Sequence, residues 1–337
     1  MRSESEFRTF YRTTLEPLLQ DLNKLRRSTR AKNMSTTVLF LLFLVLLFGL
    51  GFVVNRMIYD VWFTESKANV PIILTVIVTI ITLIYYIRTI VTNKKKFVVR
   101  YKNEIISSIV QFIDESLIYN EEDYIQEKEF IASRLFYPIP DRYGGDDFVS
   151  GTIDKTHIAF SEIHAKYKTV TTDNDGKTTE KWVPIFDGIF FKADFNKDFN
   201  GAYFVLPDMA EKMFGRAGKI FQSSKNRYGE LVRLEDPEFE KQFVVYGSDQ
   251  VEARYILSTA LIRRLLNFQQ RTGKKIYISF VKSSIYIAIP YRKQLFEPNY
   301  YSSLLSEDKT IEYFEDLEMI VGIVSDLNLN TRIWSKQ

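Results

Sequence analysis

Two uninterrupted apolar runs dominate the hydrophobic pattern near the start of the chain. Val38–Val54 contains no polar or charged side chain, and Ser35–Thr37 extend this run to the roughly 20 residues that a helix needs to cross a bilayer core. Val70–Ile87 contains three threonines and no charge. The pattern predicts a transmembrane hairpin over residues 35–92, with spans at about 35–54 and 70–90. Length, lack of charge and the late start of the first run argue against buried core helices and a signal peptide.

Amphipathic helical patterns flank these two runs. Apolar residues recur at three- and four-residue steps from Phe7 to Leu25 and again from Phe97 to Leu117, which is the spacing of one helix face. We expect residues 1–34 to form a cytoplasmic amphipathic helical segment, kinked or restarted at Pro17, and residues 93–140 to form a juxtamembrane helical stalk. Two arrangements stay open. The helices pack as a stalk, which we favour, or the first one lies flat on the membrane surface.

From about residue 125 the pattern changes, and after residue 147 short β-type segments separated by turn residues dominate. Helices are expected at 125–136, 207–214, 249–271 with a second cap at Ser258, and 307–327, with loops at 138–147 and 215–229. We therefore predict an α+β fold, in which residues 141–337 form a soluble domain on a mainly antiparallel sheet of about eight strands. The expected strands cover residues 148–153, 156–171, 178–193, 201–206, 230–234, 242–246, 276–281 and 285–290.

Basic side chains border both apolar runs and predict the orientation of the hairpin. The connecting segment 55–69 carries only two bases and two acids. The positive-inside bias therefore places this segment outside the cell, and both chain termini and the soluble domain in the cytoplasm. The absence of cysteine fits a cytosolic domain. The membrane-flanking bases that we select as site residues are Arg26, Arg27, Arg30, Lys32, Arg88, Lys94, Lys95 and Lys96.

The formal net charge of +3 hides an uneven distribution. Residues 1–36 carry eight bases and four acids, and residues 88–102 carry six bases and no acid, whereas residues 103–337 carry 29 bases and 36 acids. A basic collar beside an acidic domain suits an anionic membrane surface. It does not suit a nucleic-acid-binding domain, which needs a basic stripe on its own face. We expect the lipid bilayer and a protein as partners and no nucleic acid, and we leave a homo-oligomer open.

The sequence contains no nucleophile elbow, Walker A loop, dinucleotide-binding fingerprint or kinase signature. His157 and His164, the two histidines, are seven residues apart in an expected strand, so they would lie on opposite faces and could not share a metal. Asp173–Gly176 has the composition of a calcium loop but not its spacing, and a hairpin turn explains it. We therefore expect no catalytic, cofactor-binding or metal-binding residues and no cofactor, and we lean against an enzyme.

Several short motifs in the second half of the chain occur in a specific order. Together they resemble the bacterial, membrane-associated family known as domain of unknown function 3137, and so does the order of amphipathic start, membrane hairpin and domain. The resemblance implies a location in the bacterial cytoplasmic (inner) membrane, but no activity, cofactor or catalytic residue. The motifs are Phe186–Lys197 (FDGIFFKADFNK), Leu206–Asp208, Leu234–Tyr246 (LEDPEFEKQFVVY), Asp249–Ser258 (DQVEARYILS), Ile278–Phe280, Ile285–Ile289 and Leu295–Pro298.

These observations support three functional hypotheses. The first is a membrane-anchored cytoplasmic interaction or regulatory domain, based on the hairpin, the acidic β-rich domain and the lack of a catalytic motif. The second is a hydrolase-like enzyme at the membrane face that uses carboxylates and His157 or His164. The third is a lipid-sensing domain that uses the basic segment Lys212–Arg227. We favour the first.

Overall fold

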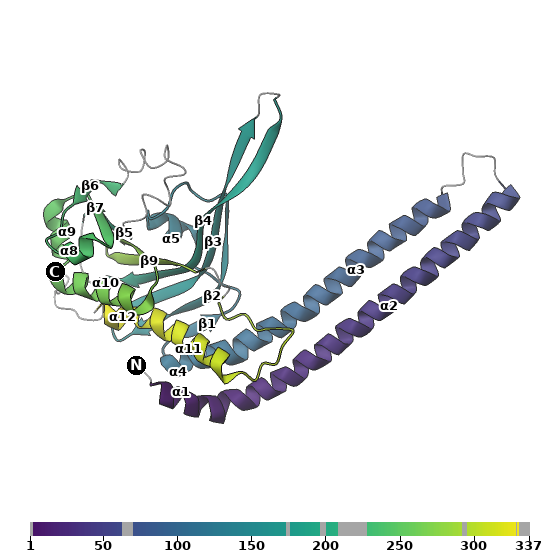
Figure 1. Ribbon diagram of the computed structural model, residues 1–337, viewed down its shortest axis with the longest axis horizontal. Coiled ribbons are helices and arrows are strands. Elements are labelled where there is room, and N and C mark those ends of the chain that lie inside the picture. Colours follow the sequence, from purple (N-terminus) through teal and green to yellow (C-terminus); the bar gives the residue numbers. More distant parts are fainter. Residues whose placement is uncertain are drawn as a thin grey trace. The chain divides into compact units, whose positions relative to one another are not determined.

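The computed structural model describes residues 3–62, 70–172, 176–195, 200–207, 228–291, 295–327 and 329. The chain divides into two compact units, each built from segments that are distant in the sequence. The sheet unit combines Met1–Phe7, Ile106–Phe296 and Glu307–Gln337, and the hairpin unit combines Arg8–Ile105 with Glu297–Ser306. Figure 1 shows the helices and strands of both units.

Two long helices form most of the hairpin unit and run side by side (Figure 1). Helix α2 (Glu16–Trp62) follows α1 (Glu4–Phe10) and the π-helical turn η1 (Tyr11–Leu15), while α3 (Val70–Tyr101) continues into a second π-helical turn, η2 (Lys102–Ile106). Both helices are long and apolar enough to cross a membrane, and no part of their most apolar stretches is buried within the protein. The two helices therefore fit the predicted hairpin and suggest membrane association.

The π-helical turn η1 explains how the first helix accommodates Pro17. A π turn is wider than an α turn, so it leaves room for the pyrrolidine ring that follows it, and α2 starts one residue before the proline. The same turn shifts the buried stripe by one position. Leu19 is buried, whereas Leu18, which the regular helical spacing selected, is half-buried.

A nine-stranded antiparallel sheet forms the centre of the sheet unit. This confirms the predicted α+β class and the mainly antiparallel sheet of about eight strands. The short edge strand β1 was not predicted. In spatial order the strands are β1 (Ile118–Asn120), β2 (Arg142–Ile153), β3 (Thr156–Thr172), β4 (Thr178–Asp194), β9 (Ser284–Pro290), β8 (Tyr277–Val281), β5 (Ala202–Pro207), β7 (Phe243–Gly247) and β6 (Glu230–Val232).

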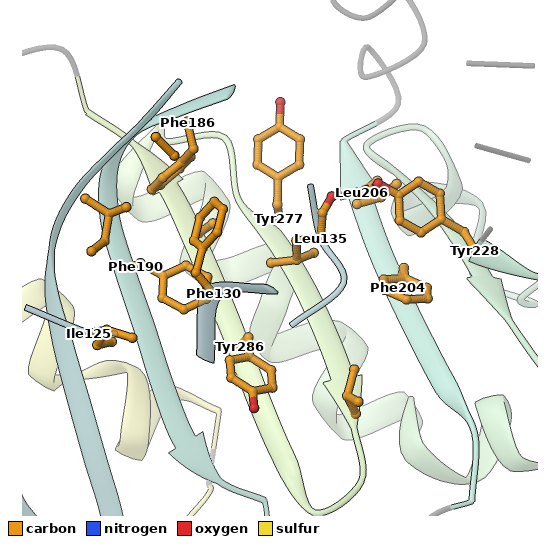
Figure 2. Packing of buried hydrophobic residues seen from close by; sticks show 14 of the residues in the cluster. Ile125, Phe130, Leu135, Phe186, Phe190, Phe204, Leu206, Tyr228, Tyr277 and Tyr286 are labelled. Carbon is orange, nitrogen blue, oxygen red and sulfur yellow. Dashed lines mark hydrogen bonds between the residues drawn. The ribbon is translucent and has the colours of Figure 1, made fainter. Parts of the chain in front are cut away.

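Helices cover both faces of this sheet (Figure 1). The short helix α5 lies over one face, where Phe130 packs into a cluster of buried aromatic and aliphatic side chains from β3, β4, β5, β8 and β9 (Figure 2). Helices α10, α11 and α12 lie on the other face (Figure 1). The helices are α4 (Ser107–Ile113), α5 (Glu127–Ala132), α8 (Pro237–Glu240), α9 (Gln250–Ile256), α10 (Thr259–Thr272), α11 (Glu307–Val321) and α12 (Ile323–Asp326).

Helices α8, α9 and α10 begin with side-chain N-caps, and the cap expected at Ser258 is present. Asp236 and Asp249 accept hydrogen bonds from backbone N–H groups in the first turns of α8 and α9, and Ser258 does the same for α10. Gly273 ends α10 in the left-handed conformation that favours glycine, with φ of 62°. The expected helical residues 208–214 and most of the expected loop at 215–229, including Lys212–Arg227, lie outside the described residues.

The prediction of a loop over 138–147 is wrong from residue 142 onward, because β2 begins at Arg142. Gly144, Gly145 and the adjacent aspartates suggested a loop. A side chain at Gly145, however, would put a Cβ atom 2.0 Å from the Glu162 carbonyl oxygen of the neighbouring strand. The register shifts between Asp146 and Val149, and Asp147 has a φ of 58°. These residues therefore mark close strand packing and a β-bulge rather than a loop.

Strands β3 and β4 extend beyond the rest of the sheet as a two-stranded arm (Figure 1). We define the arm as residues 167–172 and 178–183, where β3 pairs with β4 beyond the points at which the pairing to β2 and β9 ends. Lys168 and Glu180 form an ion pair of 2.5 Å across the arm. Val170 is 58% exposed. At the base of the arm the Arg142 guanidinium carbon lies 3.8 Å from the centre of the Trp182 ring, whereas residues 170–172 and 178–181 are exposed.

Candidate functional site

The predicted membrane-flanking bases divide into one buried residue and an exposed group. Arg26 is 5% exposed. Its Nε donates to Asn23 Oδ1 at 3.0 Å, and its Nη1 donates to the Tyr300 carbonyl oxygen at 3.3 Å. Burial lowers the pKa of the Arg26 guanidinium, and the positive charges of Arg30 and Arg27 lower it further. The exposed group comprises Arg27, Arg30, Lys32, Arg88, Lys94, Lys95 and Lys96.

Residues 297–306 form a segment that packs against α2 and α3 within the hairpin unit; we call it the docking segment. At its start, Glu297 forms an ion pair with Lys102, whose Nζ lies 2.8 Å from Glu297 Oε1. Lys102 is buried and is the first residue of η2. Further along, the Tyr300 ring packs edge-on against Phe97 with ring centroids 5.5 Å apart. One charged and one aromatic contact therefore hold the docking segment against the C-terminal end of α3 and the start of η2.

A chain of amide and hydroxyl groups connects α2, α3 and the docking segment. Asn93 Nδ2 donates to Asn33 Oδ1 at 2.9 Å, and Asn33 Nδ2 donates to the Tyr300 hydroxyl at 3.2 Å. One turn further along α2, the hydroxyls of Thr37 and Tyr86 lie 2.9 Å apart. Burial raises the pKa of the Tyr300 phenol, so it is neutral at physiological pH. These bonds satisfy polar groups that would be costly to bury alone.

The same elements line an open surface cavity of about 430 Å³, which we call the hairpin cavity. Arg30 Nη1 donates to the Tyr301 carbonyl oxygen at 3.0 Å, and its guanidinium carbon lies 5.8 Å from the centre of the Tyr301 ring. Among the residues that the structure describes, no carboxylate lines the cavity, and the lining combines basic, polar and apolar groups. The lining residues are Arg27, Arg30, Ala31, Asn33, Met34, Thr37, Tyr86, Ile90, Tyr300 and Tyr301.

A second group of polar residues lies in the sheet unit, on β3 and β4. Glu162, His164 and Asp187 each bring a ligand atom within 4.8 Å of the other two. His164 Nδ1 lies 2.7 Å from Asp187 Oδ1, because the two residues face each other in the strand pairing. The side chain of Glu162 is 3% exposed. His157, the other predicted candidate, is exposed and pairs with Thr152.

Two carboxylates and one imidazole could hold a divalent cation, or could orient the imidazole for proton transfer. Glu162 Oε2, however, already accepts a hydrogen bond of 2.9 Å from the Leu295 N–H, and the Asp187 carboxylate contacts the imidazole. Nearby, the Tyr119 hydroxyl donates to the buried Asp147 carboxylate. Internal hydrogen bonds therefore account for these acids without an ion.

Sequence reasoning did not locate either arrangement. It considered carboxylates together with His157 or His164 but named no carboxylate, although Glu162 lies two residues before His164 on the same strand face. It also left the Leu295–Pro298 motif and the tyrosines after it without a role, although Tyr300 and Tyr301 complete the hairpin cavity. A spacing of two on a strand was a usable signal, whereas no sequence pattern pointed from Tyr300 to Asn33.

Glu252, in the first turn of α9, connects two elements of the sheet unit. The N-cap bond is present, since Asp249 Oδ1 accepts from the Glu252 N–H at 2.7 Å. The Glu252 carboxylate accepts hydrogen bonds from the N–H groups of Asn200 and Gly201 at 3.2 and 3.3 Å, and from the Tyr203 hydroxyl. It therefore ties the start of α9 to the start of β5.

Comparisons with known proteins give little functional information. The search of curated proteins yields no match. Among solved structures, the chain is similar to the crystal structure of the mycobacterial trehalose monomycolate transport factor A, TtfA. That match has a TM-score of 0.29 and 12% identity, and it covers 64% of this chain and 95% of the other. Such a distant likeness carries no argument about this protein.

One known protein family matches the second half of the chain, from within β4 onward. Residues 184–329 match the family described as "Protein of unknown function (DUF3137)". This stretch contains all the motifs on which the predicted resemblance was based. The resemblance to the domain of unknown function 3137 is thus confirmed over residues 184–329.

Proposed function

We propose that this protein is a two-pass protein of the bacterial cytoplasmic membrane whose sheet unit acts as a cytoplasmic interaction or regulatory domain. The observation that carries the proposal is the uncovered apolar surface of α2 and α3. Leu46 and Phe52 on α2 are 71% and 67% exposed, and Ile73 on α3 is 55% exposed. Soluble proteins rarely expose contiguous apolar surface of this extent, and a bilayer supplies the missing cover.

Charge supports the proposed orientation. No acid occurs between Asp21 and Asp60 or between Glu65 and Glu104, whereas bases flank both apolar stretches on the side of the chain termini. Cytoplasmic flanks of membrane helices carry this excess of Lys and Arg. The orientation places the predominantly acidic residues 103–337 in the cytoplasm.

Single-cysteine labelling tests the anchor and its orientation, because the natural chain has no cysteine. Ser66→Cys marks the segment between the two helices, and Lys155→Cys marks an exposed turn of the sheet unit. A membrane-impermeant maleimide added to intact spheroplasts should label only the first variant, and lysis should make the second accessible. Release of the chain from membranes by alkaline carbonate, or the reverse labelling pattern, would overturn the proposal.

The arm is the element that best supports an interaction role. An isolated two-stranded ribbon gains little stability in water, yet β3 and β4 continue their pairing to Thr172 and Thr178. A photo-crosslinking amino acid at Val170 should give one adduct of defined mass in native membranes. The matched control is Leu231, which is 48% exposed on the edge strand β6. An adduct of twice the chain mass would identify a second copy, and identical patterns from both positions would remove the arm from the proposal.

A further inference from the structure

We propose that the hairpin cavity binds the phosphate of an anionic phospholipid headgroup, with Arg27 and Arg30 as the residues that pair with it. This inference rests on the membrane anchor proposed above. It goes further, because it assigns a specific lipid site to one face of the hairpin. It also differs from general attraction between a basic collar and the membrane surface, which every exposed base beside the helices would share.

The cavity occupies the correct depth for a phosphate. Its α2 wall runs from Arg27 to Thr37, and the uninterrupted apolar run begins at Val38. Ten residue steps of helix span about 15 Å, whereas the headgroup region on one side of a hydrocarbon core of about 30 Å is roughly 5–7 Å thick, so the cavity spans that region and continues into water. Tyr86 and Ile90 provide the α3 wall at the end of the second apolar stretch. The cavity thus extends from the water side to the edge of the apolar surface.

The two ends of the cavity suit the two ends of a lipid headgroup. Arg27, Arg30 and the Tyr301 ring lie toward the polar end, and Met34 and Ile90 line the wall with apolar surface. A phospholipid presents a phosphate next to its glycerol and acyl chains, so it needs this sequence of contacts. Tyrosine is common at this level of a membrane because its ring is apolar and its hydroxyl is polar.

The described residues that line the cavity carry positive charge from arginine and no negative charge. Arg26, Arg27 and Arg30 lie within five residues on α2, and no carboxylate from the described part of the chain lines the cavity. Arg27 has no hydrogen bond or ion pair with any residue that the structure describes. Arg30 uses Nη1 on the Tyr301 carbonyl, which leaves its other guanidinium donors for a ligand. An anion would relieve the repulsion among the three arginines.

The chemistry of arginine supports a shaped oxyanion site, such as one for a phosphate, rather than a simple surface charge. A guanidinium offers parallel N–H donors that match two phosphate oxygens, and it stacks on aromatic rings while doing so. Arg30 already lies over the Tyr301 ring. The lysines beside the second helix, Lys94 and Lys96, are exposed and do not line the cavity. They provide a matched set of charges for a control.

The test uses the full chain in lipid nanodiscs and measures retained lipid by native mass spectrometry. Nanodiscs contain phosphatidylcholine with a minor fraction of phosphatidylglycerol. The variant Arg27→Gln/Arg30→Gln is compared with the control Lys94→Gln/Lys96→Gln, which removes the same charge. Loss of two charge-assisted contacts should weaken phosphatidylglycerol retention at least about tenfold in the first variant, and the control should change it less than about threefold. Equal losses in both variants would overturn the proposal.

Two further measurements separate the alternatives. Arg27→Gln alone removes an arginine without a contact to the docking segment, so a weakening by this single change excludes mere displacement of that segment. A second arm uses nanodiscs of phosphatidylcholine alone and adds millimolar glycerol phosphate. Binding of glycerol phosphate to the chain in these nanodiscs would show that a free phosphate, not a lipid, is the ligand, and would overturn the lipid assignment. Flotation of each variant with pure phosphatidylcholine vesicles reports the membrane anchor by itself. Failure there refutes the proposed anchor, whereas normal flotation with unchanged lipid retention refutes only the lipid site.

Discussion

Truncation of Phe130 would reveal whether the segment before β2 is an integral part of the sheet unit. Phe130 lies on α5 and is 2% exposed. Its ring lies 5.2 Å from that of Phe190 between centroids (Figure 2). It also stacks on Phe136 at 5.1 Å and contacts Tyr143 at 5.4 Å. The sequence pattern had assigned this region to a stalk beside the membrane, whereas these contacts place its central aromatic ring in the core over the sheet.

The expected cost follows from this complete burial. Phe→Ala substitutions in protein cores lower the free energy of unfolding by about 3–5 kcal/mol, because they remove apolar contacts and leave a cavity. Here the surrounding side chains are large aromatic rings that come from both α5 and the sheet, so they cannot collapse easily into the space. A loss of this size accelerates amide exchange through global opening by between about one hundred and a few thousand fold.

Hydrogen–deuterium exchange of the full chain in nanodiscs measures this effect strand by strand. Phe130→Ala should accelerate exchange in β4 and β9 together with α5, since Phe190 and Tyr286 belong to the same cluster. The control is Ile139→Ala, a nearby residue that is 57% exposed and should change the free energy of unfolding by less than about 0.5 kcal/mol. Faster exchange confined to α5, with β4 and β9 as protected as before, would refute the assignment of α5 to the core.

Three further predictions concern the sheet unit. Gly145→Ala should strongly destabilise it in thermal unfolding, because the new Cβ would lie 2.0 Å from the Glu162 carbonyl oxygen, whereas Gly144→Ala has nothing within 4 Å and should be close to neutral. Asp249→Ala should lower the free energy of unfolding by about 1 kcal/mol in denaturant titrations by removing the N-cap of α9, and Asp249→Asn should restore most of it. Burial and the bond to Glu252 raise the pKa of Tyr203 to about 12. The folded state therefore keeps this proton when the unfolded chain loses it near pH 10, so the stability that Tyr203 provides is complete below about pH 10 and is lost as the pH rises toward 12. The stability difference between the natural chain and Tyr203→Phe should thus narrow over that interval, and a constant difference would contradict the role of the phenol.

Much of the fold was predictable because its signals are local. Asp236 before Pro237 and Ser258 within a helical stretch determine helix starts through hydrogen bonds that span only a few residues. The β3–β4 hairpin was equally clear, since its strands alternate around a turn that is rich in Asp and Gly. The two apolar helices needed only length and composition, which a sequence gives directly.

Features that depend on distant neighbours were not predictable in this way. Gly145 is a glycine because of the Glu162 carbonyl on the next strand, so its local context resembled a loop. Strand β1 has three residues, and it forms because Ile118–Asn120 pair with β2 more than twenty residues later. A three-residue run carries too little alternation to indicate a strand by itself. Pairing across the sheet, and not propensity, determines both features.

The hairpin cavity shows how a local pattern can predict that a partner exists without identifying it. Leu15, Leu19 and Leu22 form a buried apolar stripe on the first long helix, and buried Arg26 and Asn33 continue it before the apolar run begins. Buried polar side chains need hydrogen-bond partners, and an arginine on the same face as buried leucines therefore requires a carbonyl, an acid or an anion nearby. The docking segment supplies the carbonyl for Arg26 from Tyr300, about 270 residues later. It meets this need for Arg26 and Asn33, whereas the exposed Arg27 lines the hairpin cavity without a hydrogen bond to any described residue, so its guanidinium is available to an anion that enters from the membrane surface.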